Sequence, residues 1–174
     1  MQGEDGDCWL DVALERHEAA LMRYAASIVG AGAAADVVQD TFLALCTASR
    51  EKVEGRLGPW LFLVCKRCAL DWLRKHHRLA PLDEALVVDD RAAEATLALE
   101  RQRSLSCLSG LVDELPERQR QAVILRFSGG LSYKQIAEVM DLSVNYVGVI
   151  LHTALGRLRA RWVEPSDLSS GRSL

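Results

Sequence analysis

The segment that decides the fold is residues 132–159, SYKQIAEVMDLSVNYVGVILHTALGRLR. Ser132 followed three residues later by Gln135 is a capping-box pattern, and it predicts a helix that begins at the next residue. Residues 141–142 predict a turn, and Ser143 is a residue type that commonly caps the start of a helix. The segment therefore predicts two helices joined by a tight turn.

The second of these helices has an apolar face and an opposite, largely polar face, which is the pattern of a helix-turn-helix. At helical spacing the apolar face comprises Val147, Leu151, Ala154 and Leu158. The small Ala137 on the first helix lets the second helix approach closely. Because the second helix of a helix-turn-helix enters the major groove of DNA, we expect the same of this one. A helical hairpin with basic ends is the alternative interpretation. The residues expected to contact DNA here are Tyr133, Lys134, Ser143, Asn145, Tyr146, Val149, His152, Thr153 and Arg157.

Apolar residues recur at helical spacing through the rest of the chain, and strand-like alternation never persists. The first such stripe comprises Leu10, Leu14, Leu21, Ala25 and Ile28. Pro59 and Pro116 are each expected in the first turn of a further helix, the first running to about His77 and the second stopped by the glycines after residue 128.

The predicted fold is all-α, with two small helical domains joined by a flexible linker. Its parts are a first domain at residues 8–78, an acidic linker at 79–93, a second domain at 94–163 and a disordered tail at 164–174.

The composition is that of an ordinary globular protein, with 174 residues of which 49% are hydrophobic and 26% charged. No apolar run approaches the ~20 residues that span a bilayer. The acidic start, MQGEDGDCW, lacks the apolar core of a signal peptide. Five irregularly spaced cysteines argue against a disulfide framework. We therefore expect a cytoplasmic protein that is not embedded in a membrane.

Charge alternates in sign along the chain although the net charge is only −3. Residues 1–49 carry −6 and residues 50–78 carry +5, while residues 79–115 carry −5 and residues 116–162 carry +4. Two basic segments separated by acidic ones suit a protein that meets DNA at two places and a different partner elsewhere.

The first basic segment contains a helix, residues 58–78, with a basic face. Arginine and lysine can hold phosphates there, and an exposed indole can stack on an unpaired base. A solvated charged face is the alternative interpretation. The face comprises Trp60, Arg67 and Arg74, flanked by Lys66 and Lys75.

The same helix contains CKRC at residues 65–68, a pattern found in redox and zinc sites. Both thiols fall on the apolar face beside Trp72, and His76 and His77 lie too far along the helix to complete a tetrahedral site. We therefore expect buried packing, with no metal, no cofactor and no catalytic residues.

The segment ADVVQDTFL, residues 35–43, predicts a helix whose outer face is acidic. Its inner face comprises Val38, Thr41 and Phe42, continued by Leu45. Its outer face comprises Asp36, Gln39, Asp40 and Leu43. An acidic rim around an apolar residue suits a basic protein partner better than it suits DNA.

Taken together, these segments resemble the extracytoplasmic-function group of bacterial RNA polymerase sigma factors. Residues 115–143, LPERQRQAVILRFSGGLSYKQIAEVMDLS, are similar to the −35 recognition domain of that family. ADVVQDTFLAL and PWLFLVCKRCALDWLRK are similar to its core-binding and −10 segments, and the resemblance covers about residues 10–162. It implies a factor without catalytic activity that binds core polymerase, recruits it to promoters and helps to open the duplex.

The resemblance also implies roles for individual residues. Asp36, Gln39 and Asp40, with Leu43 on the same face, match the helix that meets the coiled coil of the largest polymerase subunit. The loop at residues 53–58, which includes Arg56, matches the loop that captures a flipped base. The residues matching the −10 segment are Trp60, Lys66, Arg67, Arg74 and Lys75. The family further implies an anti-sigma partner, which is often membrane-bound.

Two departures from the family pattern change what we expect. Arg67 stands where the family usually has asparagine, and residues 146–150, YVGVI, lack two basic side chains of the usual recognition helix.

Two other functions are possible alternatives to the sigma factor. One is a helix-turn-helix regulator that binds operators without core polymerase, and the other is a thiol- or metal-dependent enzyme or sensor.

Overall fold

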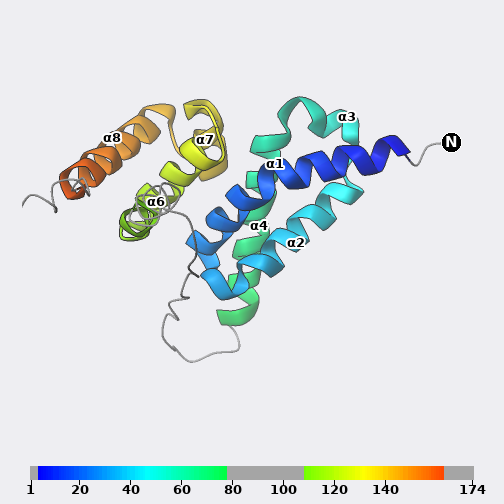
Figure 1. Ribbon diagram of the computed structural model, residues 1–174, viewed down its shortest axis with the longest axis horizontal. Helices are drawn as coiled ribbons and strands as arrows, with labels where there is room; N and C mark the ends of the chain where they lie inside the picture. The colour runs from blue at the N-terminus through cyan, green and yellow to red at the C-terminus, as the bar shows by residue number, and fades with distance from the viewer. Residues whose placement is uncertain (1–3, 78–107, 163–174) are drawn as a thin grey trace, which may run out of the picture.

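The structure is a computed structural model that describes residues 4–77 and 108–162, and every regular element in these ranges is helical (Figure 1). The N-terminal half contains α1 (Glu4–Val29), α2 (Ala31–Thr47), α3 (Arg50–Val53), the 3₁₀ turn η1 (Glu54–Arg56) and α4 (Leu57–His77). The C-terminal half contains helical residues 108–113, α6 (Glu117–Val123), the π-helical η2 (Ile124–Ser128), α7 (Tyr133–Met140) and α8 (Val144–Arg161). The predicted all-α class is confirmed.

Two predicted parts lie outside the described residues: the linker at 79–93 and the tail at 164–174. Among the helices that the structure describes, none taken singly has the length and apolar character needed to cross a membrane.

In the N-terminal half, α1, α2 and α4 pack on a shared apolar core. Gly30 separates α1 from α2 with a φ of +83°, a conformation that glycine adopts without steric cost. Thr41 is fully buried, and its hydroxyl donates to the Val37 carbonyl at 2.8 Å, so burial leaves no unpaired group there. The largest fully buried side chains of this half are Leu21, Tyr24, Leu45, Leu61 and Phe62.

One expectation for this core is wrong. Leu14 falls on the predicted apolar stripe of α1, yet its side chain is 39% exposed. The stripe of α1 is wider than the surface that α2 and α4 cover, so this leucine is left at the edge of the core.

In the C-terminal half, α7 and α8 form the predicted helix-turn-helix, with an angle of 101° between the two helices. The capping box is confirmed, because Ser132 accepts from the Gln135 amide at 3.3 Å while the Gln135 side chain accepts from the Ser132 amide at 2.8 Å. Asp141 ends α7 in the left-handed region at φ 58°. Ser143 then caps α8 by accepting from the Tyr146 amide at 3.2 Å.

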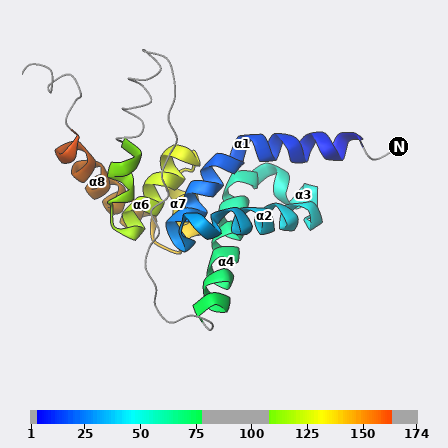
Figure 2. The same ribbon diagram turned by 60° about the horizontal axis from the view of Figure 1, so that its bottom comes forward.

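The two halves pack against each other and share one continuous apolar core. Helix α7 contacts α4, while η2 and α6 contact α1. Figures 1 and 2 both place α7 between the N-terminal helices and α8, so that α8 lies on the outer side of the C-terminal half.

We predict that Gly148→Ala stabilises the protein. Gly148 lies inside α8, where glycine costs about 1 kcal/mol relative to alanine. An added Cβ would meet only the Tyr133 ring, at 3.9 Å, which is ordinary contact. The urea midpoint should therefore rise by an amount corresponding to about 1 kcal/mol.

Gly129→Ala provides the opposite control, because a Cβ there would lie 2.8 Å from both the Leu125 carbonyl oxygen and the Phe62 ring. The urea midpoint of this variant should fall. A lower urea midpoint for Gly148→Ala would contradict the prediction, because it would show that α8 needs glycine at this position.

Candidate nucleic-acid interface

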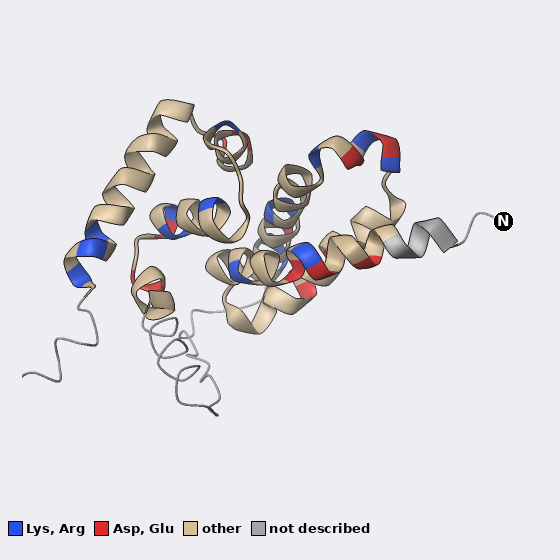
Figure 3. Cartoon of the chain, turned by 45° about the horizontal axis from the view of Figure 1, so that its top comes forward, with Lys and Arg blue, Asp and Glu red and all other residues tan. Residues whose placement is uncertain are grey.

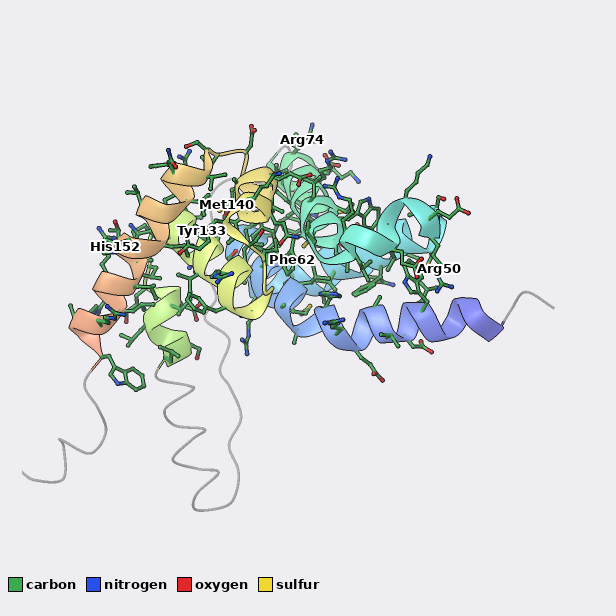
Figure 4. All side chains as sticks on the ribbon, turned by 90° about the horizontal axis from the view of Figure 1, so that it is seen from above. Arg50, Phe62, Arg74, Tyr133, Met140 and His152 are labelled. Atoms are coloured by element: carbon green, nitrogen blue, oxygen red, sulfur yellow. The ribbon has the colours of Figure 1, made fainter. Side chains whose placement is uncertain are left out.

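The outer face of α8 is exposed and uncharged through its first three turns. Asn145, Tyr146, Val149, His152 and Thr153 are all exposed, as we expected for base-contacting residues. His152 points away from the rest of the molecule (Figure 4). This face offers an amide, a phenol, an imidazole and a bare isopropyl group, which are groups that can meet base edges in a major groove.

Some of the predicted contact residues already have partners within the chain. Thr153 donates to the Val149 carbonyl at 2.9 Å, and Arg157 donates to the side chain of Gln119 at 3.3 Å. The Arg126 guanidinium lies 5.5 Å from the centroid of the Tyr133 ring, a cation–π geometry that holds the ring. These residues are therefore pre-positioned along the edges of the recognition face.

The positive charge of α8 lies at its C-terminal end, as the blue segment of Figure 3 shows. Arg157, Arg159 and Arg161 are exposed there, and Arg161 forms an ion pair with Glu114. Lys134, near the start of α7, is also exposed. Phosphate contacts by this half would thus come from the far end of α8 and from α7 rather than from the middle of the recognition helix.

The basic face of α4 divides into an open part and a covered part. Arg67, Arg74 and Lys75 are exposed, and Arg74 pairs with Asp71 on the same helix. Figure 4 shows Arg74 at the edge of the molecule. The open part is the surface on which a nucleic-acid backbone can lie.

One expectation for this face needs correction, and two cations near it have partners on α7. Trp60, expected to be exposed, is half-buried against the shared core. Lys66 is also half-buried, and its Nζ donates to the Val139 carbonyl of α7 at 2.9 Å. Arg56 is exposed but forms an ion pair with Glu138 of α7. A helical wheel of α4 alone cannot show these contacts, because α7 is more than 50 residues further along the chain.

The acidic face of α2 is exposed as predicted. Asp36, Gln39 and Asp40 all face solvent, and Leu43 is 58% exposed. This face borders a groove of about 370 Å³ between α1 and α2. The groove is lined by Leu14, Glu18, Met22, Ala35, Val38, Gln39, Phe42, Leu43 and Cys46.

Three of the groove residues, Leu14, Glu18 and Met22, come from α1 and were not among the residues predicted for this surface. Their spacing of four residues places them on one side of α1, which is the available signal. Of the three, Leu14 alone falls on the apolar stripe expected to form the core, and nothing in the sequence of α1 shows where α2 stops covering it.

The CKRC thiols are covered by surrounding residues rather than exposed to solvent. Cys65 is fully buried, and burial raises its pKa to about 12. Cys68 is half-buried, and burial raises its pKa as well. In the part of the chain that the structure describes, no three His, Cys, Asp or Glu side chains are grouped closely enough to hold a metal ion.

Comparison with known proteins identifies the family. The sigma-70 region 2 family matches residues 13–79, and the sigma-70 region 4 family matches residues 105–158. The chain is 30% identical over 138 residues to the RNA polymerase sigma factor SigV of Bacillus subtilis, covering 78% of this chain and 79% of SigV. The chain belongs to the extracytoplasmic-function group of RNA polymerase sigma factors. The sigma factor is also 26% identical over 127 residues to the ECF sigma factor SigM of the same organism, covering 73% of this chain and 78% of SigM.

Two solved structures share the fold of this sigma factor. One is the sigma factor RpoE in complex with the anti-sigma factor NepR from Bartonella quintana, with a TM-score of 0.64, 22% identity and coverage of 97% of this chain and 99% of that one. The other is CnrH in complex with the cytosolic domain of CnrY, with a TM-score of 0.55, 22% identity and coverage of 94% and 89%.

The matched regions contain the surfaces described above. Region 2 includes the acidic face of α2 and the basic face of α4, and region 4 includes the helix-turn-helix. An operator-binding regulator explains only the second of these regions, so that alternative is not favoured. The family consists of transcription initiation factors rather than enzymes.

We predict that the cysteines differ sharply in reactivity. Cys46 is exposed, whereas Cys65 is buried and has a raised pKa, so at pH 8 only about one Cys65 thiol in 10⁴ is ionised. In the native protein at pH 8, iodoacetamide should label Cys46 within minutes and leave Cys65 unlabelled until urea is added. Mass spectrometry of the peptides measures both. Equal labelling rates in the native protein would contradict the buried packing of Cys65.

Proposed function

We propose that this sigma factor binds core RNA polymerase through α2 and the groove beside it, and places the basic face of α4 and the outer face of α8 on promoter DNA. It acts in the cytoplasm with the polymerase and carries out no catalytic step itself. The observation that supports this most is the presence, on one chain, of an acidic face with an apolar centre and two separate surfaces suited to DNA.

The charge and shape of the surface beside α2 suit a helical segment of polymerase. Asp36 and Asp40 stand beside an apolar groove that also carries Glu18. An amphipathic basic helix could lay its apolar side into the groove and its cations against these carboxylates. The same carboxylates repel a phosphate backbone, which keeps DNA away from the surface. Coiled-coil helices of the largest polymerase subunit are the proposed occupant.

The proposed −10 surface consists of exposed cations of α4. Arg67, Arg74 and Lys75 can neutralise phosphates of the opened strand. Trp60 keeps part of its indole accessible beside them. Arg56 and Lys66 complete this surface only when α7 moves away, since both contact α7 in the described arrangement.

The proposed −35 surface is the outer face of α8, which carries no Lys, Arg, Asp or Glu in its first three turns. An asparagine amide such as that of Asn145 can pair with the N6 and N7 positions of adenine, and Val149 can contact the methyl group of thymine. With only distant arginines to hold phosphates, this helix should bind duplex weakly by itself. Weak intrinsic binding suits a subunit that acts within polymerase.

An anti-sigma factor is a further proposed partner. Two solved structures that share the fold are complexes, one of the sigma factor RpoE with NepR and the other of CnrH with the cytosolic domain of CnrY. A protein antagonist of this chain could compete with polymerase for the groove between α1 and α2, whose apolar centre and acidic rim would accept either partner.

The proposed function is tested by run-off transcription with purified core enzyme on a set of candidate promoters. Specific transcripts should appear only when this chain is added. Asp36→Arg combined with Asp40→Arg should abolish both the transcripts and the co-purification of core enzyme, because it reverses the charge of the proposed contact. Circular dichroism should be unchanged, since both aspartates are exposed.

The control reverses two other exposed acids, Glu51 and Asp113, which lie outside α1 and α2. It carries the same change in net charge and should retain core binding. Core binding that survives Asp36→Arg with Asp40→Arg would remove the acidic face from the proposal. Tight operator binding without core enzyme would favour the regulator instead.

A second prediction concerns the α1 side of the groove. Leu14→Asp should weaken core binding by about tenfold or more, because it puts a carboxylate in the apolar centre. Val12→Asp is the matched control, since Val12 is 53% exposed on the same helix and does not line the groove. Titration of each variant with labelled core enzyme measures the effect. Equal affinities for the two variants would show that the partner does not enter the groove.

A further inference from the structure

The bridging segment, residues 48–58, runs from the end of α2 into the first turn of α4 and has little local structure to hold it in place. Within it α3 has only four residues and η1 only three, far fewer than an isolated helix needs. Ser49, at the N-cap of α3, makes no side-chain capping bond. The Arg50–Glu54 ion pair is exposed at both ends, so it contributes little to stability. The order of this segment therefore depends on contacts with other elements.

Three contacts fix the bridging segment to the N-terminal half. Val53 is only 2% exposed and inserts into the apolar core. The guanidinium carbon of Arg50 lies over the ring of Trp9, 5.7 Å from its centroid. The Cε1 atom of His17 lies 3.6 Å from the place that a Cβ on Gly58 would occupy. Two of the three contacts are thus made by side chains of α1.

Helix α1 holds both ends of the bridging segment. Trp9 and His17 are eight residues apart, which is about 12 Å along a helix at 1.5 Å per residue. Figures 1 and 2 both show α3 beside the N-terminal part of α1, and Figure 4 shows Arg50 between α3 and α1. Because α1 is one continuous helix, it sets the distance between the two ends that it contacts.

The contact between Trp9 and Arg50 is a cation–π interaction. Tryptophan offers the best aromatic face for a cation, and the separation lies within the ~6 Å range of this interaction. Trp9 is half-buried, so it packs against the core and still presents its ring to the guanidinium. Arg50 also donates to the Glu54 carboxylate at 3.3 Å. A planar guanidinium suits both contacts, because it can stack on a ring while its edge donates to a carboxylate.

Trp9 lies outside the part of the chain that the family comparison covers. The sigma-70 region 2 family matches residues 13–79, which include Arg50 and His17 but not Trp9. Trp9 also does not line the groove between α1 and α2 that is assigned to polymerase. Its contact with Arg50 is therefore separate from the surfaces described above.

The bridging segment leads directly into the proposed −10 surface, since Arg56 ends η1 and Trp60 lies in the first turn of α4. We propose that Trp9 and Arg50 are positioning residues of this sigma factor: they hold residues 48–58 against α1 so that Arg56 and Trp60 meet the opened promoter strand in a fixed arrangement. The proposal rests on the proposed function, because that function assigns Arg56 and Trp60 to promoter DNA. A segment that is already ordered loses little conformational freedom when DNA binds, so the contact favours binding without touching the DNA.

Hydrogen exchange in the free chain tests the contact itself. The Lys52 amide donates to the Ser49 carbonyl at 3.0 Å and the Glu54 amide donates to the Arg50 carbonyl, so both amides report on the bridging segment. Trp9→Leu keeps an apolar side chain against the core but removes the ring, and it should speed exchange of these amides about fivefold. Trp9→Tyr keeps an aromatic face and should retain most of the protection. Mass spectrometry of the peptides measures the exchange.

A double-mutant cycle separates the contact from the other packing of Trp9. If Trp9 acts through Arg50, adding Trp9→Leu to Arg50→Met should speed exchange by less than about twofold. Lys52→Met is the matched control, because Lys52 is an exposed cation of the same short helix with no ion pair among the described residues. In the Lys52→Met background, Trp9→Leu should keep its full effect. A Trp9→Leu effect that persists beside Arg50→Met, or that is absent from the wild-type background, would overturn the proposal.

Promoter opening tests the positioning role. With core enzyme and the candidate promoter that gives the strongest run-off transcript, Trp9→Leu and Arg50→Met should each lower the permanganate reactivity of unpaired thymines about fivefold. Lys52→Met should lower it by less than about twofold. Affinity for labelled core enzyme should be unchanged, because neither Trp9 nor Arg50 lines the groove. Equal losses of opening and core binding, or equal effects of Arg50→Met and Lys52→Met, would overturn the positioning role.

Thermal unfolding should confirm that the variants are folded. Arg50 is exposed, so Arg50→Met provides the test even if Trp9→Leu does not fold.

Run-off transcription separates this result from the proposed function. Promoter-specific transcripts from wild type, together with unchanged exchange in Trp9→Leu, would overturn the positioning contact and leave the proposed function standing. Transcripts absent from every variant would overturn the proposed function, and the positioning role of Trp9 and Arg50 would fall with it.

Discussion

The packing of Phe62 between Tyr24 and Gly129 is the contact on which the joined structure depends. It makes one continuous core out of helices that come from the two ends of the chain. A buried aromatic ring removes a large apolar area from water, so this one residue contributes strongly to holding the halves together. The polar contacts of Arg56 and Lys66 with α7 fix the orientation of the two halves, while burial of the Phe62 ring stabilises their packing.

Charge then separates the surfaces that this packing leaves open. The outer face of α2 is acidic, the open face of α4 is basic, and the first turns of α8 carry no charge on their outer side. The acidic face of α2 disfavours DNA because its carboxylates repel phosphates, while the cations of α4 attract them. A single small chain can in this way present separate surfaces to a protein and to two stretches of DNA.

Local sequence patterns predicted the helix-turn-helix well, because its determinants are themselves local. The capping box at Ser132 and Gln135 and the cap at Ser143 act within three residues, and all were found as predicted. The outward face of α2 was also predicted, since helical spacing alone separates Asp36 from Val38. The errors fell where another helix decides exposure, as at Leu14 and Trp60.

The sequence by itself determined the helical class, the helix-turn-helix and the family, because periodicity, capping residues and motif order are written along the chain. Only the tertiary structure decided that Leu14 lines a groove and that α7 covers Arg56 and Lys66. Such facts depend on how far one helix extends over another. A helical wheel describes one helix alone, so it shows neither where α2 stops covering α1 nor that α7 lies against α4.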